Sequence, residues 1–264
     1  MIFGRADPAL IRIQDCRYGR MMYLANDAYI GRALDVYGEY SEAEVVLWRQ
    51  LLQPNWVVVD AGANIGAHTV ALARLVPQGH VVAFEPIPFL YYLLCGNLAL
   101  NGLTSVRALN AAAGEAAGSI VVPPLDYTKP ENYGGLALGG FTQGFRVDVV
   151  PLDDVLRVVH FIKADVEGME GAVLHGAARL LRECRPVLYV ENNPSPAMPE
   201  LIAQIHALDY DLWWHYAPHF NAENYGRMPV DHEPGVISFN MLGLPKGSPI
   251  KVNGLTKIPE GDHQ

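Results

Sequence analysis

The sequence predicts an α/β protein built around a doubly wound, mostly parallel sheet. Short apolar runs rich in β-branched residues recur along the chain, and they lack the polar alternation of half-exposed strands. Segments with helical periodicity separate these runs. Because no internal repeat or low-complexity tract interrupts this alternation, we expect one core domain over residues 55–246, with a small N-terminal extension of helix and strand (1–54) packed on it and a C-terminal tail (247–264).

The composition narrows the class of protein. The 264 residues are 50% hydrophobic and 18% charged, which supports a large core and excludes global disorder. The 19 basic and 28 acidic residues give a net charge of −9, so we expect no broad electropositive surface for DNA or ribosomal RNA. Three widely spaced cysteines without a C-x-x-C pair are typical of a reducing compartment. With neither a signal-peptide pattern nor an apolar run of roughly 20 residues, we expect a cytoplasmic protein without a membrane span.

The elements follow in chain order. A helix is predicted over 41–53, where Ser41 and Glu44 have the spacing of a capping box and Pro54 ends the helix. Apolar runs then predict strands at 57–60, 81–85, 106–110, 161–165 and 187–191. Helical periodicity between them predicts helices at 65–75, 88–101 and 171–181.

Two further segments depart from that alternation. Residues 115–151, rich in Pro, Gly and Tyr, are predicted to form a hairpin-like insertion. After a helix at 201–209, strands at 212–216 and 236–241 complete the domain, and the loop between them, 217–235, is long enough to suggest a functional role.

The residues that follow the first strand of the domain suggest a ligand site. Ligands bind beyond the carboxyl ends of parallel strands, and Gly62 and Gly66 allow the backbone to turn tightly and approach one closely. Asp60 would repel a phosphate there but suits an ammonium group. A nicotinamide fingerprint needs a second glycine where Asn64 stands, so the pattern favours S-adenosylmethionine (SAM) over NAD. An ordinary tight turn is the structural alternative.

Glu85 strengthens the case for an adenosyl ligand. It closes the second strand 25 residues after Asp60, where a carboxylate can accept hydrogen bonds from ribose hydroxyls, and Pro86 supports the turn after it. NAD also uses an acid at this position, so Glu85 does not separate the two cofactors. Asn110, at the end of the third strand, is a further candidate cofactor-binding residue.

Four motifs together resemble the FkbM-type class I SAM-dependent methyltransferases: DAGANIG (60–66), FEP (84–86), NLALNGL (97–103) and KADVEGME (163–170). The segments YGEYSEAE (37–44) and SFNMLGLPK (238–246) are similar to flanking segments of some members. The resemblance implies a Rossmann-like SAM domain and methyl transfer to oxygen, often on sugars or polyketide-type natural products. It also suggests that Glu39 closes over the cofactor.

Carboxylates at the end of the fourth strand are the catalytic candidates. Asp165 and Glu167 stand at its carboxyl tip, beside the expected methyl sulfonium, where one carboxylate could take the proton from a hydroxyl nucleophile. Helix N-terminal capping is the alternative role for Glu167 and Glu170. We expect Lys163 to orient or pair with a carboxylate rather than act as a base.

Glu191 and Asn192 end the fifth strand and are also candidates, Glu191 as a catalytic residue. With Asp165 they resemble the metal site of catechol-type O-methyltransferases, and oxygen ligands of this kind suit Mg²⁺. The sequence therefore predicts a magnesium site formed by Asp165, Glu191 and Asn192, although the FkbM resemblance does not itself imply a metal.

The expected partner is a small hydroxylated acceptor, a sugar or natural product, and homo-oligomers are compatible with the sequence. Trp213, Trp214 and the amide side chains after them suit a saccharide or another hydroxylated ring, or else form an apolar cover of the sheet. His215 and His219 are secondary base candidates, and His68 is expected on a helix surface or in the core. A nicotinamide oxidoreductase and a SAM- or glycan-binding module without turnover remain alternatives.

Overall fold

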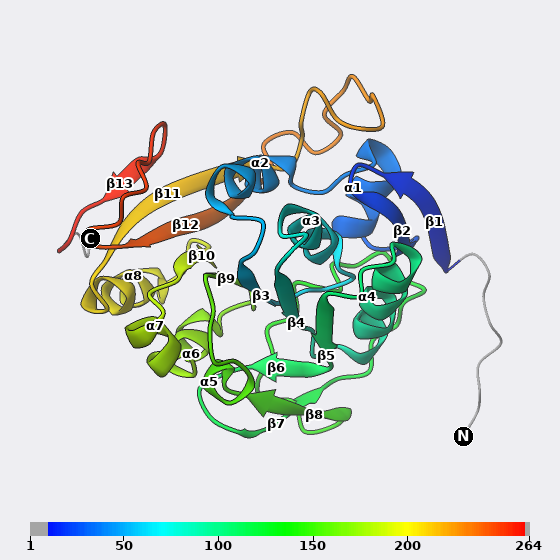
Figure 1. The fold of residues 1–264 in the computed structure, drawn as a ribbon. Helices are drawn as coiled ribbons and strands as arrows, with labels where there is room; N and C mark the ends of the chain where they lie inside the picture. Colours follow the sequence, from blue (N-terminus) through cyan, green and yellow to red (C-terminus); the bar gives the residue numbers. More distant parts are fainter. Residues whose placement is uncertain (1–9, 262–264) are drawn as a thin grey trace.

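The centre of the fold is an eight-stranded sheet, seen in a computed structural model that describes residues 10–261. Its strand order is β13-β11-β12-β10-β9-β3-β4-β5 (Figure 1). The parallel strands are β3 (Val57–Ala61), β4 (His80–Phe84), β5 (Val106–Leu109), β9 (Phe161–Ala164) and β10 (Val187–Glu191). The antiparallel strands are β11 (Tyr210–Pro218), β12 (Ile237–Pro245) and β13 (Thr256–Ile258). The predicted doubly wound, mostly parallel α/β fold is confirmed.

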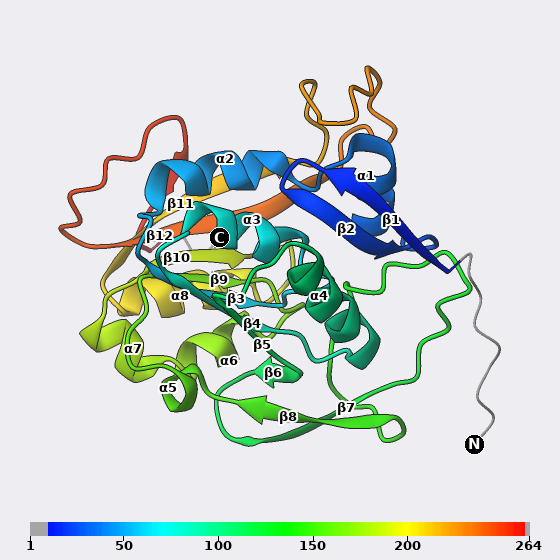
Figure 2. The same cartoon turned by 45° about the vertical axis from the view of Figure 1, so that its right-hand side comes forward.

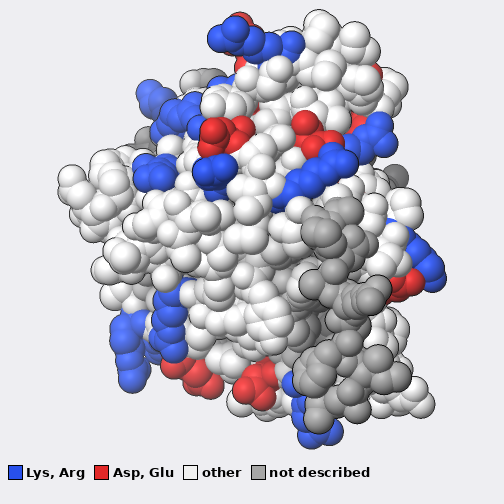
Figure 3. Space-filling view, turned by 90° about the vertical axis from the view of Figure 1, so that its right-hand side faces the viewer, with Lys and Arg blue, Asp and Glu red and all other residues white. Residues whose placement is uncertain are grey.

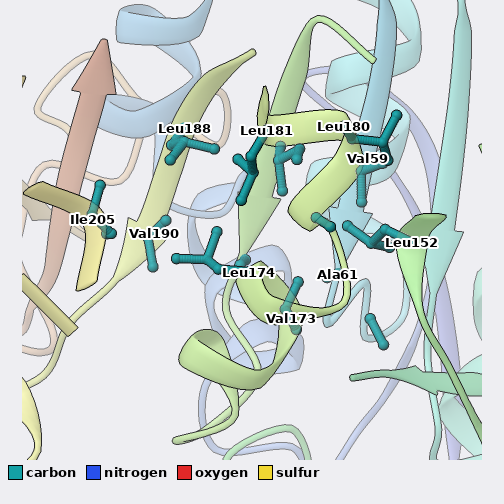
Figure 4. Close-up of a cluster of buried hydrophobic side chains, with 14 of the residues drawn as sticks. Val59, Ala61, Leu152, Val173, Leu174, Leu180, Leu181, Leu188, Val190 and Ile205 are labelled. Carbon is teal, nitrogen blue, oxygen red and sulfur yellow. The ribbon is translucent and has the colours of Figure 1, made fainter. Parts of the chain in front are cut away.

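Helices cover both faces of this sheet. One face is covered by α2 (Glu42–Leu51), α3 (Ala67–Leu75) and α4 (Pro88–Leu100). The other face is covered by α5 (Leu152–Val155), α6 (Glu170–His175), α7 (Ala178–Glu183) and α8 (Met198–Ala207). Figure 4 shows the core on this second face, where strand residues such as Val59 and Leu188 pack against Leu174 and Leu181. These strands are apolar without alternation because both their faces are buried.

The strand order reverses direction at β3, and this places the ligand site. β4 pairs with β3 on one side and β9 pairs with it on the other, so the helices that follow β3 and β9 lie on opposite faces. The loops after these two strands therefore diverge and leave a crevice at the carboxyl edge of the sheet.

The N-terminal extension contains both strands and helices, in agreement with the predicted fold class. A hairpin of β1 (Ile11–Cys16) and β2 (Gly19–Leu24) precedes α1 (Ile30–Tyr37), and α2 follows close to the predicted 41–53. The predicted capping box is wrong in its details: Ser41 lies at φ +43°, its hydroxyl donates to the Glu44 carboxylate at 2.8 Å, and its side chain does not cap the helix. Residues 1–9 of the extension lie outside the described residues.

The insertion and the tail also differ in detail from the expectation. β6 (Ala111–Ala113) pairs with β8 (Phe145–Val150), and β7 (Gly118–Val122) forms the expected antiparallel pair with β8. The predicted helix 171–181 is divided into α6 and α7, with Gly176 between them. The tail supplies β13, which extends the sheet edge beside β11. Residues 262–264 are outside the described part of the chain.

The surface of the side that carries β1 shows basic and acidic side chains interspersed around an uncharged centre (Figure 3). The described residues of this side form no broad basic surface of the kind that duplex DNA requires. Between residues 10 and 261, none of the helices is both long enough and apolar enough to span a bilayer.

Candidate active site

A cavity of about 290 Å³ lies at the carboxyl ends of β3, β4, β9 and β10. Most of the predicted site residues line this cavity: Gly62, Asn64, Glu85, Pro86, Asp165, Glu167 and Glu191. The walls also come from the N-terminal extension, the insertion and the segment before β12. The position is the one expected for a ligand site at the reversal point of a doubly wound sheet.

The turn after β3 (residues 61–66, the glycine turn) requires glycine at position 62. Gly62 lies at φ +80°, and a Cβ atom built on it would stand 1.8 Å from the carbonyl oxygen of Asp165. Its N–H donates to the carbonyl of Phe84 at 3.0 Å, which fixes the turn against β4. Gly66 does not line the cavity; its Cβ would meet Leu94 of α4 at 2.6 Å, so this predicted cofactor residue serves helix packing instead.

Glu85 forms one end of the cavity and is held by backbone donors. Its carboxylate accepts hydrogen bonds from the N–H groups of Asn64 and Ile87, both at 2.7 Å. Burial raises the pKa of Glu85 to about 7, against the lowering effect of these two bonds. Asn110 lies outside the cavity lining and donates its amide hydrogens to the carbonyls of Glu85 and Pro86. Asn110 therefore supports the turn that carries Glu85 rather than reaching a ligand itself.

Apolar side chains also line the cavity. They belong to Ile87, Ala112, Ala113, Leu136 and Leu138, the last two from the insertion. The insertion approaches the glycine turn so closely that a Cβ atom on Gly134 would lie 1.8 Å from the side-chain nitrogen Nδ2 of Asn64. Sequence analysis did not find these insertion residues, because no local pattern shows where a long loop returns.

The predicted role of Asp60 as an ammonium ligand is wrong. Its side chain is fully buried and does not line the cavity. Its carboxylate pairs with Lys163 at 3.1 Å and accepts a hydrogen bond from Thr69 at 2.6 Å. The same ammonium group lies 3.3 Å from the Asp165 carboxylate. The structure thus supports the pairing role predicted for Lys163, and that residue neutralises Asp60 at the position where a ligand ammonium was expected.

The electrostatics around Lys163 keep it charged. Burial alone would lower the pKa of Lys163, but the charges of Asp60, Asp165 and Glu44 outweigh it and hold that pKa above its ordinary value. Glu44 is a buried carboxyl from α2, and burial raises its pKa to about 7. A network of charges therefore lies directly behind Asp165.

Three carboxylates converge in the cavity: Asp165, Glu167 and Glu191 each offer an oxygen within 4.8 Å of the others. We call them the carboxylate cluster. Burial, then the charges of Asp165 and Glu167, raise the pKa of Glu191 to about 10. Burial, then the charges of Asp165 and Glu170, raise the pKa of Glu167 to about 7. Like charges this close cannot all ionise, so the cluster holds a proton or attracts a cation.

Glu170 and Asn192 have structural roles. The Glu170 carboxylate accepts hydrogen bonds from the N–H groups of Val166 at 2.9 Å and Gly168 at 3.2 Å, so it fixes the loop before α6. The prediction that Asn192 is a metal ligand is wrong, because consecutive residues of a strand point to opposite faces. Its amide turns away from the cluster and contacts the carbonyl of Met198 and the sulfur of Met241.

An aromatic wall, formed by Tyr29, Tyr40, His68 and His219, lines the cavity beside the glycine turn. The ring of Tyr40 lies 5.0 Å from that of His68 and 5.4 Å from that of His219. Burial lowers the pKa values of both histidines, so their imidazoles are neutral near pH 7. His68 lies on the predicted helix, but its cavity position was not expected. Its Nε2 has no hydrogen-bond partner among residues 10–261.

Two more predicted residues differ from the expectation. His215 lies outside the cavity and its Nδ1 is 2.7 Å from the hydroxyl of Tyr189. Glu39 does not line the cavity either, and its carboxylate is engaged by Arg17 at 2.6 Å. Asn240 was missed: it stands opposite Glu191 in the β10–β12 register and lines the cavity, and its Nδ2 has no hydrogen-bond partner in the described part of the chain.

Comparison with known proteins identifies the family. The family model for the methyltransferase FkbM domain matches residues 60–212. Methyltransferase sdnD of Sordaria araneosa is 30% identical over 200 residues, which cover 61% of this chain and 76% of that protein. The crystal structure of methyltransferase FkbM from Methylobacillus flagellatus KT is 22% identical with a TM-score of 0.49, and the match covers 74% of this chain and 45% of that one. This chain thus spans less than half of that protein.

A fourth comparison concerns the fold alone. TYW2 of M. jannaschii, crystallised in complex with AdoMet, is 15% identical with a TM-score of 0.50, and the match covers 92% of this chain and 88% of that chain. The two proteins share the class I methyltransferase fold. The family match covers more than half of the chain and includes the glycine turn, Glu85 and the carboxylate cluster, and therefore this chain belongs to the FkbM methyltransferase family.

Proposed function

We propose that the protein is a SAM-dependent O-methyltransferase whose acceptor is a hydroxyl group of a sugar or a polyketide-type natural product. The observation that carries this proposal is the position of Asp165, which faces the cavity while Lys163 binds its other side at 3.3 Å. A carboxylate held in this way can accept a proton from a hydroxyl group. Family membership favours methyl transfer over the hydride transfer of a nicotinamide enzyme.

The residues of the cavity fit SAM at its nucleoside end. The two oxygens of Glu85 each accept one backbone N–H and keep a lone pair for a ribose hydroxyl. The apolar side chains of the cavity suit an adenine ring. When bound, SAM supplies an electrophilic methyl group on a sulfonium ion. The acidic cavity complements that positive charge.

The chain's own residues supply the proton chemistry. Asp165 takes the proton of the attacking hydroxyl, and Lys163 orients its carboxylate from 3.3 Å. Glu191, with its pKa raised to about 10, holds a proton near pH 7 and can donate a hydrogen bond to an acceptor oxygen or to Asp165. Asn240 offers its unpartnered amide nitrogen to a second oxygen of the acceptor.

The acceptor has a route to these groups. A second cleft of about 440 Å³, between α6 and α8, shares Glu167, Glu191 and Asn193 with the cofactor cavity. The carboxylate cluster therefore lies between the two spaces, and an acceptor in the second cleft would meet a cofactor in the first across it.

The cluster is also a suitable donor set for a hard cation. Asp165, Glu167 and Glu191 would hold Mg²⁺ through carboxylate oxygens, and the cation would lower the pKa of a coordinated acceptor hydroxyl. Exhaustive EDTA treatment separates this version from the proton-sharing one. If turnover is lost and then restored by Mg²⁺, the cluster binds a cation. If turnover is retained, the cluster acts through a shared proton.

Turnover with candidate acceptors tests the proposal. SAM is incubated with the protein and a panel of glycosides and polyketide-type alcohols, and S-adenosylhomocysteine (SAH) and methyl ethers are measured by mass spectrometry. Asp165→Asn should abolish product while SAH still binds in calorimetry. The matched control is Asp211→Asn. Asp211 lies on β11 and forms a surface pair with Lys257 of β13, so this variant should retain turnover. Methylation at nitrogen or carbon, or full activity of Asp165→Asn, would refute the assignment.

A further inference from the structure

The long connection between β11 and β12 rests on the N-terminal extension. We call residues 219–236 the β11–β12 segment; it rises beside α1 in both views of the fold (Figures 1 and 2). The N–H of Gly226 donates to the carbonyl of Tyr37 at 2.6 Å, and the N–H of His232 donates to the Tyr37 hydroxyl at 2.8 Å. Arg32 of α1 lies 3.1 Å from Glu233. Segments about two hundred residues apart in the sequence are therefore joined by several polar contacts.

Glu39 is at the centre of this junction. Its side chain is 1% exposed, and its carboxylate accepts hydrogen bonds from Arg17 at 2.6 Å, Asn221 at 2.9 Å and the N–H of Tyr225 at 2.7 Å. Arg17 also donates to the carbonyl of Glu223 at 2.6 Å. A buried charge with this many donors is satisfied within the junction, which explains why Glu39 does not reach the cavity.

Both ends of the β11–β12 segment form part of the cavity wall. His219 begins it, Val236 ends it, and both line the cavity. The His219 imidazole lies 3.0 Å from the Ser238 hydroxyl, and its ring packs on Tyr40 of the aromatic wall. Tyr40 in turn packs on His68, which lies just after the glycine turn. The segment therefore reaches the part of the cavity next to that turn.

We propose that Glu39 is a positioning residue that holds the β11–β12 segment in place as a wall of the cofactor cavity. Glu39 fixes the segment through Arg17, Asn221 and Tyr225, outside the cavity. His219, at the start of the segment, contacts Tyr40 of the aromatic wall inside the cavity. Release of the segment opens the cavity and speeds the escape of a bound cofactor. This inference rests on the proposed function, since it requires that the cavity binds SAM and its product.

The variant Glu39→Gln tests the role of the junction. It removes the charge that pairs with Arg17 and places amide hydrogens where an acceptor oxygen stood. Two quantities are measured on the full chain: the dissociation rate constant of SAH by surface plasmon resonance, and amide hydrogen exchange over residues 219–236. We expect faster exchange in the segment and dissociation of SAH faster by up to about tenfold, because the loss of one charge-assisted hydrogen bond in the junction limits the effect on the cavity. The association rate constant should change little.

Two further variants make the result specific. Asp35→Asn is the matched control, because Asp35 forms a similar 2.6 Å ion pair with Arg12 in the same extension without contacting the segment. It should leave both quantities unchanged. Asn221→Ala loosens the junction from the segment's side, and should reproduce the effect of Glu39→Gln even if that variant does not fold.

The outcomes separate this inference from the proposed function. A wild-type protein that does not bind SAH refutes the proposed function, while hydrogen exchange still reports whether Glu39 holds the segment. Faster exchange in Glu39→Gln and Asn221→Ala with unchanged SAH dissociation would show that the segment is no cofactor wall. Unchanged exchange, or equal effects in Asp35→Asn, would show that Glu39 does not position it. The inference is overturned by unchanged SAH dissociation in variants with faster exchange, and equally by unchanged exchange or by the same effects in Asp35→Asn.

Discussion

Replacement of Lys163 by methionine should strongly destabilise the protein. Lys163 is 2% exposed and lies between the carboxylates of Asp60 at 3.1 Å and Asp165 at 3.3 Å. The Asp165 side chain is 32% exposed, so water can replace the lost ammonium there. Asp60 is fully buried and would keep only the hydroxyl of Thr69. The penalty therefore falls mainly on Asp60.

The size of the loss follows from that burial. Removing one partner of a buried ion pair costs about 3–5 kcal/mol, because the other charge stays in a medium of low dielectric constant. Asp60→Asn in the Lys163→Met background removes the unpaired charge and keeps an oxygen for Thr69, so the double variant should recover about 2 kcal/mol of the loss. Lys257→Met breaks a surface pair in which the lysine is 58% exposed, and should cost about 0–1 kcal/mol.

Urea denaturation at pH 7.5 measures these differences through the free energy of unfolding. The reasoning would be refuted if Lys163→Met were no more destabilised than Lys257→Met. It would also be refuted if the losses in the double variant were the sum of those in the single variants, since Asp60 and Lys163 would then not act as a coupled pair.

Three other predictions follow from the site. Asp165→Asn should lower kcat by about 10²–10⁴-fold with little change in SAH affinity, and a wild-type kcat on the same acceptor would contradict the base assignment. Burial raises the pKa of Glu85 to about 7, and only its ionised form accepts hydrogen bonds from both ribose hydroxyls. The Kd for SAH should therefore rise as the pH falls below 7, by up to about tenfold per pH unit. A Kd that stays constant in calorimetry from pH 8 to pH 6 would contradict this role of Glu85. Gly62→Ala should lose roughly 2–5 kcal/mol in denaturant unfolding, because its Cβ would lie 1.8 Å from the Asp165 carbonyl oxygen at a positive φ; near-native stability would show that the turn can relax.

The central sheet could be predicted from the sequence because its signal is local. The five parallel strands are mostly apolar and each is bounded by a helix or a turn, so β3, β4, β5, β9 and β10 lie within one or two residues of their predicted limits. The carboxyl ends of parallel strands share one edge of a sheet. This rule predicts that Glu85, Asp165 and Glu191 lie close together, and all three line the cavity. The limits of the β1–β2 hairpin in the N-terminal extension were not predicted, because part of its burial depends on contacts with α4, which is distant in the sequence.

The roles of several side chains depended on tertiary contacts. Asp60 was predicted from its strand position to face a ligand, but the lysine two residues before Asp165 takes that position. Asn192 points away because the pleat alternates, and Glu167 enters the cluster because its backbone adopts φ +54°. A sequence pattern places a residue at the end of a strand, whereas the direction of its side chain depends on the local turn.

The sheet, the strand ends that carry the chemistry, and the methyltransferase family can be predicted from the sequence, because each is encoded in residues close together along the chain. Which charges are already paired, and which remain free for a ligand, depends on the tertiary structure. Asp60 and Glu39 are engaged by Lys163 and Arg17, and neither partner follows from spacing. The physical reason is that a buried charge must be satisfied by whatever the fold brings within about 3 Å, and that distance is independent of separation in the sequence.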